Sequence, residues 1–349
     1  MEAASLLVPM FRRQMEHCQV TADEAVALVT DVKSDRELVA ASFAAALDIG
    51  AEVFEVTVPE YGRNSVGAEI SAGQGGSLRL PEGPTEACKN ADMVFDFTLE
   101  GFIHVPQRTE IREAGTRILR VGSRQPFVLR RLMPWEPEEA QAVKQKVQDA
   151  RDRLEAADEM RITSEYGTDI TMEVEPETAF DSYGFVDVPG KWDVWGQNMV
   201  SNYPTNVNGT IVIAPGDYNV VPFNDYVGSA IECVVEDSHI VEINGEGGDA
   251  EIMRGHMESY NDPDVYATSH FGWGLNENGK FYNMAIHDRK PDETGVSASE
   301  GRVWEGNMLW STGPNTHQER YTNCHYDIAQ KNCSVYLDGE PVVEHGELV

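Results

Sequence analysis

The first third of the chain alternates short apolar runs with helical patterns, and this alternation restricts the fold more than any other feature. Ser34 or Asp35 can cap the first of the helices. Such a β-α repeat predicts a doubly wound parallel sheet with right-handed crossovers. The expected buried strands are residues 25–32, 53–58, 93–99 and 117–121, and the expected helices are residues 35–48, 85–90 and 106–114.

The pattern changes after a long polar helix, expected at residues 136–157, which we interpret as a connector. The chain of 349 residues is longer than one core usually serves. We therefore expect an α/β fold of two domains, a doubly wound parallel-sheet domain over residues 1–160 and a β-rich α+β domain over residues 161–349. The second domain is expected to contain hairpins at 162–175, 231–243 and 335–343 and one helix at 250–260.

The glycines of the first half do not form a nucleotide-binding motif. No G-x-G-x-x-G follows the first expected strand. Gly73, Gly75 and Gly76 fall in an expected loop without a helix directly after it. We therefore predict no dinucleotide site.

The net charge of the chain is strongly negative. Lys and Arg together number 27 against 59 Asp and Glu, which gives −32 at pH 7. A nucleic-acid partner is not expected, because phosphate binding requires a basic face. The acidic residues are spread along the chain, and such repulsion is best tolerated where salt screens it. We expect a halophilic source, with an acidic enzyme from an ordinary source as the alternative.

Several features point to the cytoplasm. No apolar run approaches the about 18 residues of a membrane span, so no membrane partner is expected. The first residues lack the basic and then apolar order of a signal peptide. The five cysteines form no C-x-x-C pair, and we expect them to be reduced.

The segment at residues 323–328 contains a histidine and an aspartate two positions apart, His325 and Asp327. In an extended chain both side chains project from the same face, while Cys324 points to the other. Together with His270 they would form the two-histidine, one-carboxylate triad that holds non-haem Fe(II). Gly272 and Gly274, which follow His270, permit a close backbone approach. The alternatives are a hydrogen-bonded pair on a sheet and a buried structural histidine.

Several ordered strings carry a family resemblance, loosely in the first half and tightly from Gly184 onward. The chain resembles the 2,5-dihydroxypyridine 5,6-dioxygenase family, whose scaffold is related to that of the thermophilic metallo-aminopeptidases. The strings are YNDPDVY at 260–266, SHFGWGL at 269–275, IHDR at 286–289, STGPNT at 311–316, CHYDI at 324–328 and NC at 332–333.

The resemblance implies an Fe(II)-dependent, ring-cleaving dioxygenase of nicotinate degradation that opens 2,5-dihydroxypyridine, or a close analogue, with dioxygen. It implies that His270, His325 and Asp327 are the iron ligands, the same residues that the spacing suggests. It also implies that Ser311 and His104 line the substrate pocket, and that the protein is a homo-oligomer such as a hexamer. His104 could instead be a loop residue, and Ser311 a turn or cap residue.

One departure from the family pattern affects the substrate. The family has a substrate-facing histidine where this chain has Val194, and valine can neither move a proton nor donate a hydrogen bond. His256, on the expected helix near the triad, is a candidate replacement. A benzenoid para-diol or an aminophenol is therefore an alternative ring to a hydroxypyridine.

Two other functions compete with the dioxygenase. A metallo-aminopeptidase would need a second metal ion, for which Glu246 and Glu251 are the candidate ligands. A non-catalytic binding module would need no metal ligands at all. Glu246 and Glu251 lack the surroundings expected of such a site, and the intact triad counts against a binding module, so we favour the dioxygenase.

Overall fold

The computed structural model describes residues 2–59, 80–98, 101, 102, 105, 107–123, 125–284 and 298–349. Contacts between residues divide the chain into two compact units. The first unit contains the described residues up to Lys144 together with Ser182–Gln197, and the second contains Gln145–Asp181 and Asn198–Val349. Within the described residues, no helix is both long and apolar enough to cross a membrane.

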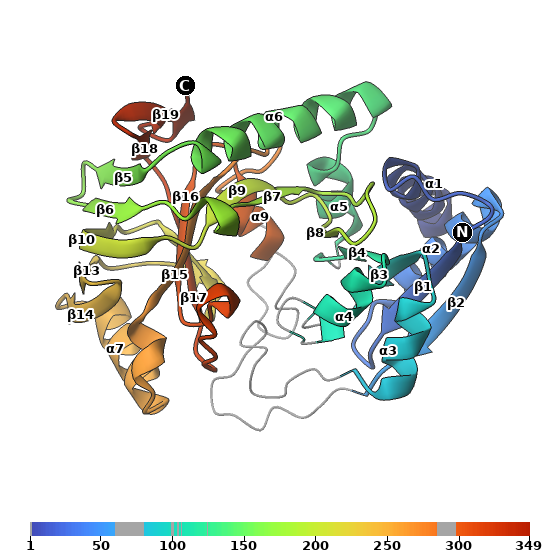
Figure 1. The fold of residues 1–349 in the computed structure, drawn as a ribbon, viewed down its shortest axis with the longest axis horizontal. Helices are drawn as coiled ribbons and strands as arrows, with labels where there is room; N and C mark the ends of the chain where they lie inside the picture. The colour runs from blue at the N-terminus through green and yellow to red at the C-terminus, as the bar shows by residue number, and fades with distance from the viewer. Residues whose placement is uncertain are drawn as a thin grey trace. The chain divides into compact units, whose positions relative to one another are not determined.

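The first unit is built on a parallel sheet with the strand order β2-β1-β3-β4-β8, which can be followed in Figure 1. Helices α1 and α2 pack together, as do α3 and α4. This arrangement confirms the predicted doubly wound α/β domain. The strands are β1 (Ala25–Thr30), β2 (Glu52–Thr57), β3 (Met93–Asp96), β4 (Arg117–Arg120) and β8 (Trp192–Val194). The helices are α1 (Glu2–His17), α2 (Arg36–Ile49), α3 (Glu82–Lys89), α4 (Gln107–Glu113) and α5 (Pro126–Leu132).

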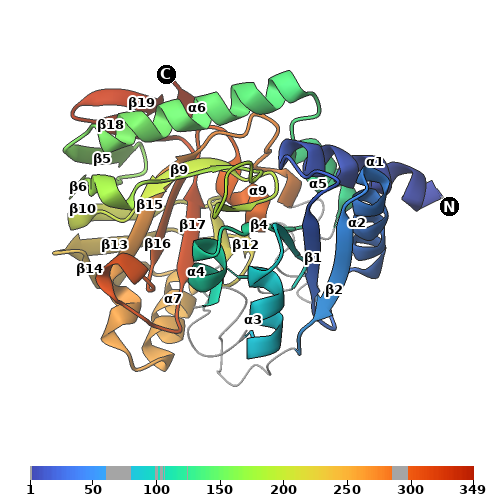
Figure 2. The ribbon, with the colours of Figure 1, turned by 45° about the vertical axis from the view of Figure 1, so that its right-hand side comes forward.

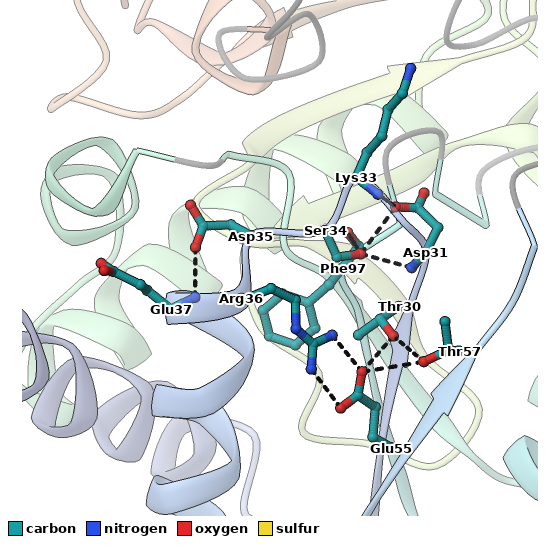
Figure 3. A network of polar contacts seen from close by, with 10 residues as sticks. All are labelled: Thr30, Asp31, Lys33, Ser34, Asp35, Arg36, Glu37, Glu55, Thr57 and Phe97. Carbon is teal, nitrogen blue, oxygen red and sulfur yellow. Dashed lines mark hydrogen bonds and ion pairs between the residues drawn. The ribbon is translucent and has the colours of Figure 1, made fainter.

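The polar loop between β1 and α2 is satisfied by its own side chains, as Figure 3 shows. Asp35 caps α2, because its carboxylate accepts from the backbone N–H groups of Glu37 at 2.9 Å and Leu38 at 3.1 Å. The Ser34 hydroxyl accepts from the Asp31 N–H at 2.8 Å and lies 2.9 Å from the Phe97 carbonyl, to which it donates. The N-terminus of α2 is therefore neutralised by a carboxylate of the same loop.

The strand β8 returns to the first sheet late in the sequence and pairs with β4. Asp193, which is fully buried, accepts from the backbone N–H groups of Tyr183 at 2.9 Å and Gly184 at 3.2 Å. Burial raises the pKa of this carboxyl to about 6.

The expected single boundary at residue 160 differs from the observed division. The chain leaves the first unit after Lys144 and returns to it for Ser182–Gln197. The difference arises because β8 completes a sheet that begins far upstream.

The second unit contains two further sheets, one of eight strands and one of seven. Figure 2 labels β14, β13, β10, β6, β5, β18 and β19 of the first of these sheets and β12, β17, β16, β15 and β9 of the second. The eight-stranded sheet has the order β14-β13-β10-β6-β5-β18-β19-β20. Its strands are β5 (Glu159–Ser164), β6 (Asp169–Glu173), β10 (Thr205–Ile213), β13 (Ile231–Glu236), β14 (His239–Asn244), β18 (Cys333–Leu337), β19 (Glu340–Glu344) and β20 (Glu347–Leu348). The three predicted hairpins are confirmed as β5–β6, β13–β14 and β18–β19.

The seven-stranded sheet, of order β12-β11-β17-β16-β15-β9-β7, contains the strands that bear the candidate site. Its strands are β7 (Phe180–Tyr183), β9 (Asn198–Asn202), β11 (Tyr218–Val221), β12 (Asp225–Tyr226), β15 (Thr268–Gly274), β16 (Met308–Thr312) and β17 (Tyr326–Gln330). The predicted connector and the later helix are confirmed as α6 (Pro137–Glu155) and α7 (Gly248–Ser259), and α9 spans Ala298–Val303. Short 3-10 turns are at Pro176–Thr178, Pro263–Tyr266 and Thr316–Gln318.

Candidate metal site

Three neighbouring strands of the seven-stranded sheet carry the candidate site. β16 lies between β15 and β17 and pairs antiparallel with both. His270 is on β15, Ser311 on β16 and Asp327 on β17, and His325 directly precedes β17. In this register Ser311 pairs with Asp327. The sheet therefore places side chains that are up to 57 positions apart in the sequence on one small area.

A shift in the pairing of two strands sets the direction of the His270 side chain. The pairing of β15 with β16 shifts between Thr268 and Phe271, and His270 lies within this shift. Bulges of this kind re-aim side chains next to functional sites. The His270 N–H, which is released from regular pairing, donates to the Ser311 hydroxyl at 3.1 Å. Ser311 thus holds the backbone of the bulge.

The glycines after His270 serve strand packing. A Cβ at Gly272 would lie 2.0 Å from the Val200 carbonyl oxygen of β9, and one at Gly274 would lie 2.4 Å from the carbonyl oxygen of Trp304. Both positions require glycine, because no side chain fits such distances. The close backbone approach expected here is therefore made to neighbouring elements of the fold.

His270, His325 and Asp327 converge. One potential ligand atom from each lies within 4.8 Å of the others. The Nε2 atom of His270 is 3.5 Å from Asp327 Oδ1, and that of His325 is 3.9 Å from Oδ2. These distances exceed a hydrogen bond. Two donors on one ion at about 2.0–2.2 Å would lie ~3 Å apart, so a small contraction suffices.

The two imidazoles are held in the form that binds metal ions. The Nδ1 atom of His325 lies 2.8 Å from the Thr312 carbonyl, to which it can only donate, so Nε2 presents its lone pair to the cluster. Burial lowers the pKa of His270 to about 4 and also lowers the pKa of His325. Both rings are therefore neutral at pH 7, as metal ligation requires.

The carboxylate is ionised and only partly satisfied. Burial pulls the pKa of Asp327 upward, but the neighbouring Arg302 keeps that pKa below its ordinary value. Arg302 Nε donates to Oδ2 at 2.6 Å. Oδ1, which is buried and faces His270, has no hydrogen-bond partner among the described residues. Such an orphaned oxygen beside two neutral imidazoles fits a divalent cation.

Arg302 is the residue of this site that the sequence did not reveal. It lies on α9, 25 positions before Asp327. No spacing rule links two residues so far apart, because their contact depends on how α9 packs onto the sheet. A short helix with one arginine has no local pattern that would indicate a contact with a metal site.

The other candidates have different surroundings. His256 is on α7, and its ring packs against those of Phe223, Tyr260 and Tyr326 with centroids 5.3, 5.3 and 5.5 Å away. The group of potential metal ligands in the described part of the chain does not include it. Its catalytic role stays a prediction. His104 and the string 286–289 lie outside the described residues. Glu246 and Glu251, the candidates for a second metal, are exposed.

Comparisons with known proteins match the whole length of the chain. The family model described as 2,5-dihydroxypyridine 5,6-dioxygenase matches residues 6–349. A relative with that name from Pseudomonas putida is 33% identical over 98% of this chain and 96% of its own length.

Solved structures give the same result. The 2,5-dihydroxypyridine dioxygenase of Pseudomonas putida KT2440 superposes with a TM-score of 0.88 at 31% identity, covering 99% of this chain and 97% of that one. AmpT from Thermus thermophilus, at 14% identity and a TM-score of 0.60, covers 99% of each chain and shares the fold. The match to the family model and the 33% identity over nearly the whole length place the chain in the 2,5-dihydroxypyridine 5,6-dioxygenase family.

Proposed function

We propose that this protein is a ring-cleaving dioxygenase that uses Fe(II) bound by His270, His325 and Asp327. The observation that carries the proposal is the convergence of these three buried side chains, with ligand atoms within 4.8 Å of one another. Two imidazoles and one carboxylate on one face of the ion leave its remaining positions open, the arrangement typical of non-haem Fe(II) oxygenases. The names of the relatives support dioxygenase chemistry on a hydroxypyridine.

The protein residues supply geometry and charge. A ferrous ion in this cluster would supply the redox chemistry that lets a closed-shell aromatic ring react with dioxygen. The Thr312 carbonyl orients His325, and the Ser311 hydroxyl orients the backbone of His270. Since that hydroxyl accepts from the His270 N–H, its own proton is left to donate elsewhere. We propose that Ser311 donates a hydrogen bond from this O–H to the substrate and keeps its proton.

The proposed reaction takes 2,5-dihydroxypyridine to N-formylmaleamate. The bond between ring carbons 5 and 6 breaks, and both atoms of dioxygen enter the product, so no additional reductant is required. A benzenoid para-diol or an aminophenol is the alternative ring, because valine occupies position 194. Val194 is 3% exposed and belongs to β8 of the first unit.

Oxygen consumption tests the proposal. The purified chain, reconstituted with Fe(II) without oxygen, should take up one dioxygen per dihydroxypyridine consumed in an oxygen electrode. Di- and trihydroxypyridines, para-diols and aminophenols are screened in parallel, and the metal-free chain is the control. Absence of uptake with every ring, from a chain that holds iron, would refute the dioxygenase. Hydrolysis of a peptide by a chain holding two zinc or cobalt ions would favour the aminopeptidase instead.

The substitution Val194→His tests the ring assignment. If position 194 lies at the ring, restoring a group that can hydrogen-bond should raise turnover of 2,5-dihydroxypyridine. Val194→Leu is the matched control, because it adds volume without a polar group. Equal or lower turnover in Val194→His would count against this explanation of the departure.

We also propose that the protein is a homo-oligomer, such as a hexamer, and that it tolerates high salt. The charge of −32 supports the second point, since screening relieves repulsion within the folded chain. Light scattering gives the mass in solution. Unfolding midpoints that rise with sodium chloride between about 0.1 and 1 M would support the salt requirement.

A further inference from the structure

The two oxygens of the Asp327 carboxylate have different surroundings. Oδ2 accepts from Arg302 Nε at 2.6 Å and is 3.9 Å from His325 Nε2. Oδ1 is 3.5 Å from His270 Nε2 and has no hydrogen-bond partner in the described part of the chain. The Asp327 side chain is 1% exposed and that of Arg302 14%, so water competes little for either group. Oδ2 is thus held by a hydrogen bond, and Oδ1 is available to a metal ion.

The helix α9 holds the guanidinium in place. Glu300, on the same helix and 2% exposed, accepts from the Lys280 N–H at 2.9 Å and from Asn283 Nδ2 at 3.1 Å. A Cβ at Gly301 would meet the Tyr218 ring of β11 at 3.2 Å, which shows how closely the helix lies on the sheet. Val303 is fully buried. A side chain presented by so constrained an element acts as a fixed partner.

The charge of Arg302 does not favour metal binding. A guanidinium is permanently positive and repels a divalent cation in the cluster. A carboxylate can bind an ion through one oxygen or through both. With Arg302 on Oδ2, the second oxygen is withheld from the ion, and one coordination position that it would fill stays open.

We propose that Arg302 is a positioning residue that restricts Asp327 to ligation through Oδ1 alone. The inference rests on the proposed function, because it requires an ion bound by His270, His325 and Asp327. Its consequence is an additional open position at the metal ion, which a reaction that joins a ring and dioxygen needs. Arg302 therefore keeps room for the reactants and does not strengthen metal binding.

Manganese(II), bound to the full chain in the absence of oxygen, tests this assignment. Arg302→Met removes the donor and the charge but keeps much of the side-chain length. We expect it to bind one Mn(II) per chain with a dissociation constant that is unchanged or up to about tenfold lower, because repulsion is removed. The water-proton relaxation enhancement of the bound ion should fall by the equivalent of about one exchangeable water, because Oδ2 joins the ion. Arg302→Lys, which keeps a charged donor, should restore the relaxation toward the wild-type value.

A matched control is Arg254→Met on α7, where the guanidinium donates to the Ile243 carbonyl at 2.8 Å in the same unit. It should leave the affinity and the relaxation unchanged. Circular dichroism establishes that each variant is folded. If Arg302→Met does not fold, Arg302→Gln, which keeps a neutral donor, takes its place and should show a smaller fall in relaxation than expected for Met.

Three results would overturn the inference. The first is a relaxation in the folded Arg302 variant equal to that of the wild type. The second is metal binding weakened by about 10- to 100-fold, which would make Arg302 an ordinary supporting partner of the ligand. The third is a wild-type chain that binds neither Mn(II) nor Fe(II) at one per chain. That last result overturns the proposed function as well, whereas the first two leave the proposed function intact.

Discussion

The loop after β1, which is only partly buried, and the largely buried ligand cluster on β15–β17 are both polar, but they differ in how their groups are satisfied. In the loop, Asp35 caps α2 and Ser34 bridges to the Phe97 carbonyl, so hydrogen bonds within the fold account for both side chains (Figure 3). In the cluster, Asp327 Oδ1 and His270 Nδ1 lack partners among the described residues. Because an unpaired buried polar group is costly, the difference separates a structural network from a site that a ligand completes.

The largest expected effect is the loss of the metal ion from the ligand cluster, two polar atoms of which have no hydrogen-bond partner within the described ranges of the chain. His325→Ala or Asp327→Ala should abolish retention of Fe(II), because a triad that loses one ligand cannot enclose the ion. The circular dichroism spectrum should be unchanged, and metal content after gel filtration is the measurement. Asp35→Ala, in the satisfied loop, is the control and should retain iron fully. Iron retained at one per chain in the Asp327 variant would show that the comparison is mistaken.

The second largest effect is expected from acidification, which should lower the stability of the metal-free protein through the cluster. The folded-state pKa of His270 is about 4, below the ordinary value of 6.5, so the unfolded chain binds a proton at a higher pH than the folded one. The metal-free protein should therefore lose stability as the pH falls from 6.5 to 4, by up to about 1.4 kcal/mol per pH unit. Denaturant titrations at several pH values measure the slope. His270→Gln should flatten it, and an equally steep slope in that variant would assign the effect elsewhere.

Ser311→Ala probes the hydrogen bond that holds the bulge at His270. Loss of the acceptor should cost about 1 kcal/mol and weaken Fe(II) or Mn(II) binding by about tenfold or more, because the ligand is less well oriented. Ser311→Thr keeps the hydroxyl and should restore affinity. Isothermal titration under nitrogen gives the dissociation constants. An alanine variant with wild-type affinity would remove Ser311 from the ligand scaffold.

The smallest effect is expected in the loop after β1, where a substitution should change stability only slightly. Asp35→Ala should lower the free energy of unfolding by about 1 kcal/mol, since α2 loses its capping acceptor. Asp35→Asn, which keeps a capping oxygen, should recover most of this stability. Urea denaturation measures both. A metal affinity that changed with either variant would contradict the structural role given to this loop.

The first unit could be predicted largely from its own sequence, because buried parallel strands produce continuous apolar runs. Three of its elements, α1, α5 and β8, are absent from the prediction. The helix α1 contains Pro9 in its interior, which argues against a helix on local grounds. The strand β8 has only three residues and joins β4 from a distant part of the chain. Such elements depend on tertiary pairing, which overrides local preference.

In the candidate site, too, some residues could be predicted from local pattern and others could not. The alternation of side chains along an extended segment is sufficient to predict that His325 and Asp327 share one face. The bulge at His270 and the Arg302 contact depend on the register of strands and on the seating of α9, which no local pattern records. Sequence thus indicates the candidate ligands, whereas the groups that orient them are brought to the site only by tertiary packing.

The late return of β8 has a consequence for synthesis on the ribosome. Until residues 192–194 have emerged, β4 is left as an unprotected sheet edge, and its buried residues Ile118 and Leu119 lie beside open backbone groups. A fragment that ends at residue 160 should therefore self-associate, although it contains four of the five strands of the sheet. We therefore expect slow translation through residues 160–194 to lower the yield of folded chain, because it prolongs the time for which this edge is open.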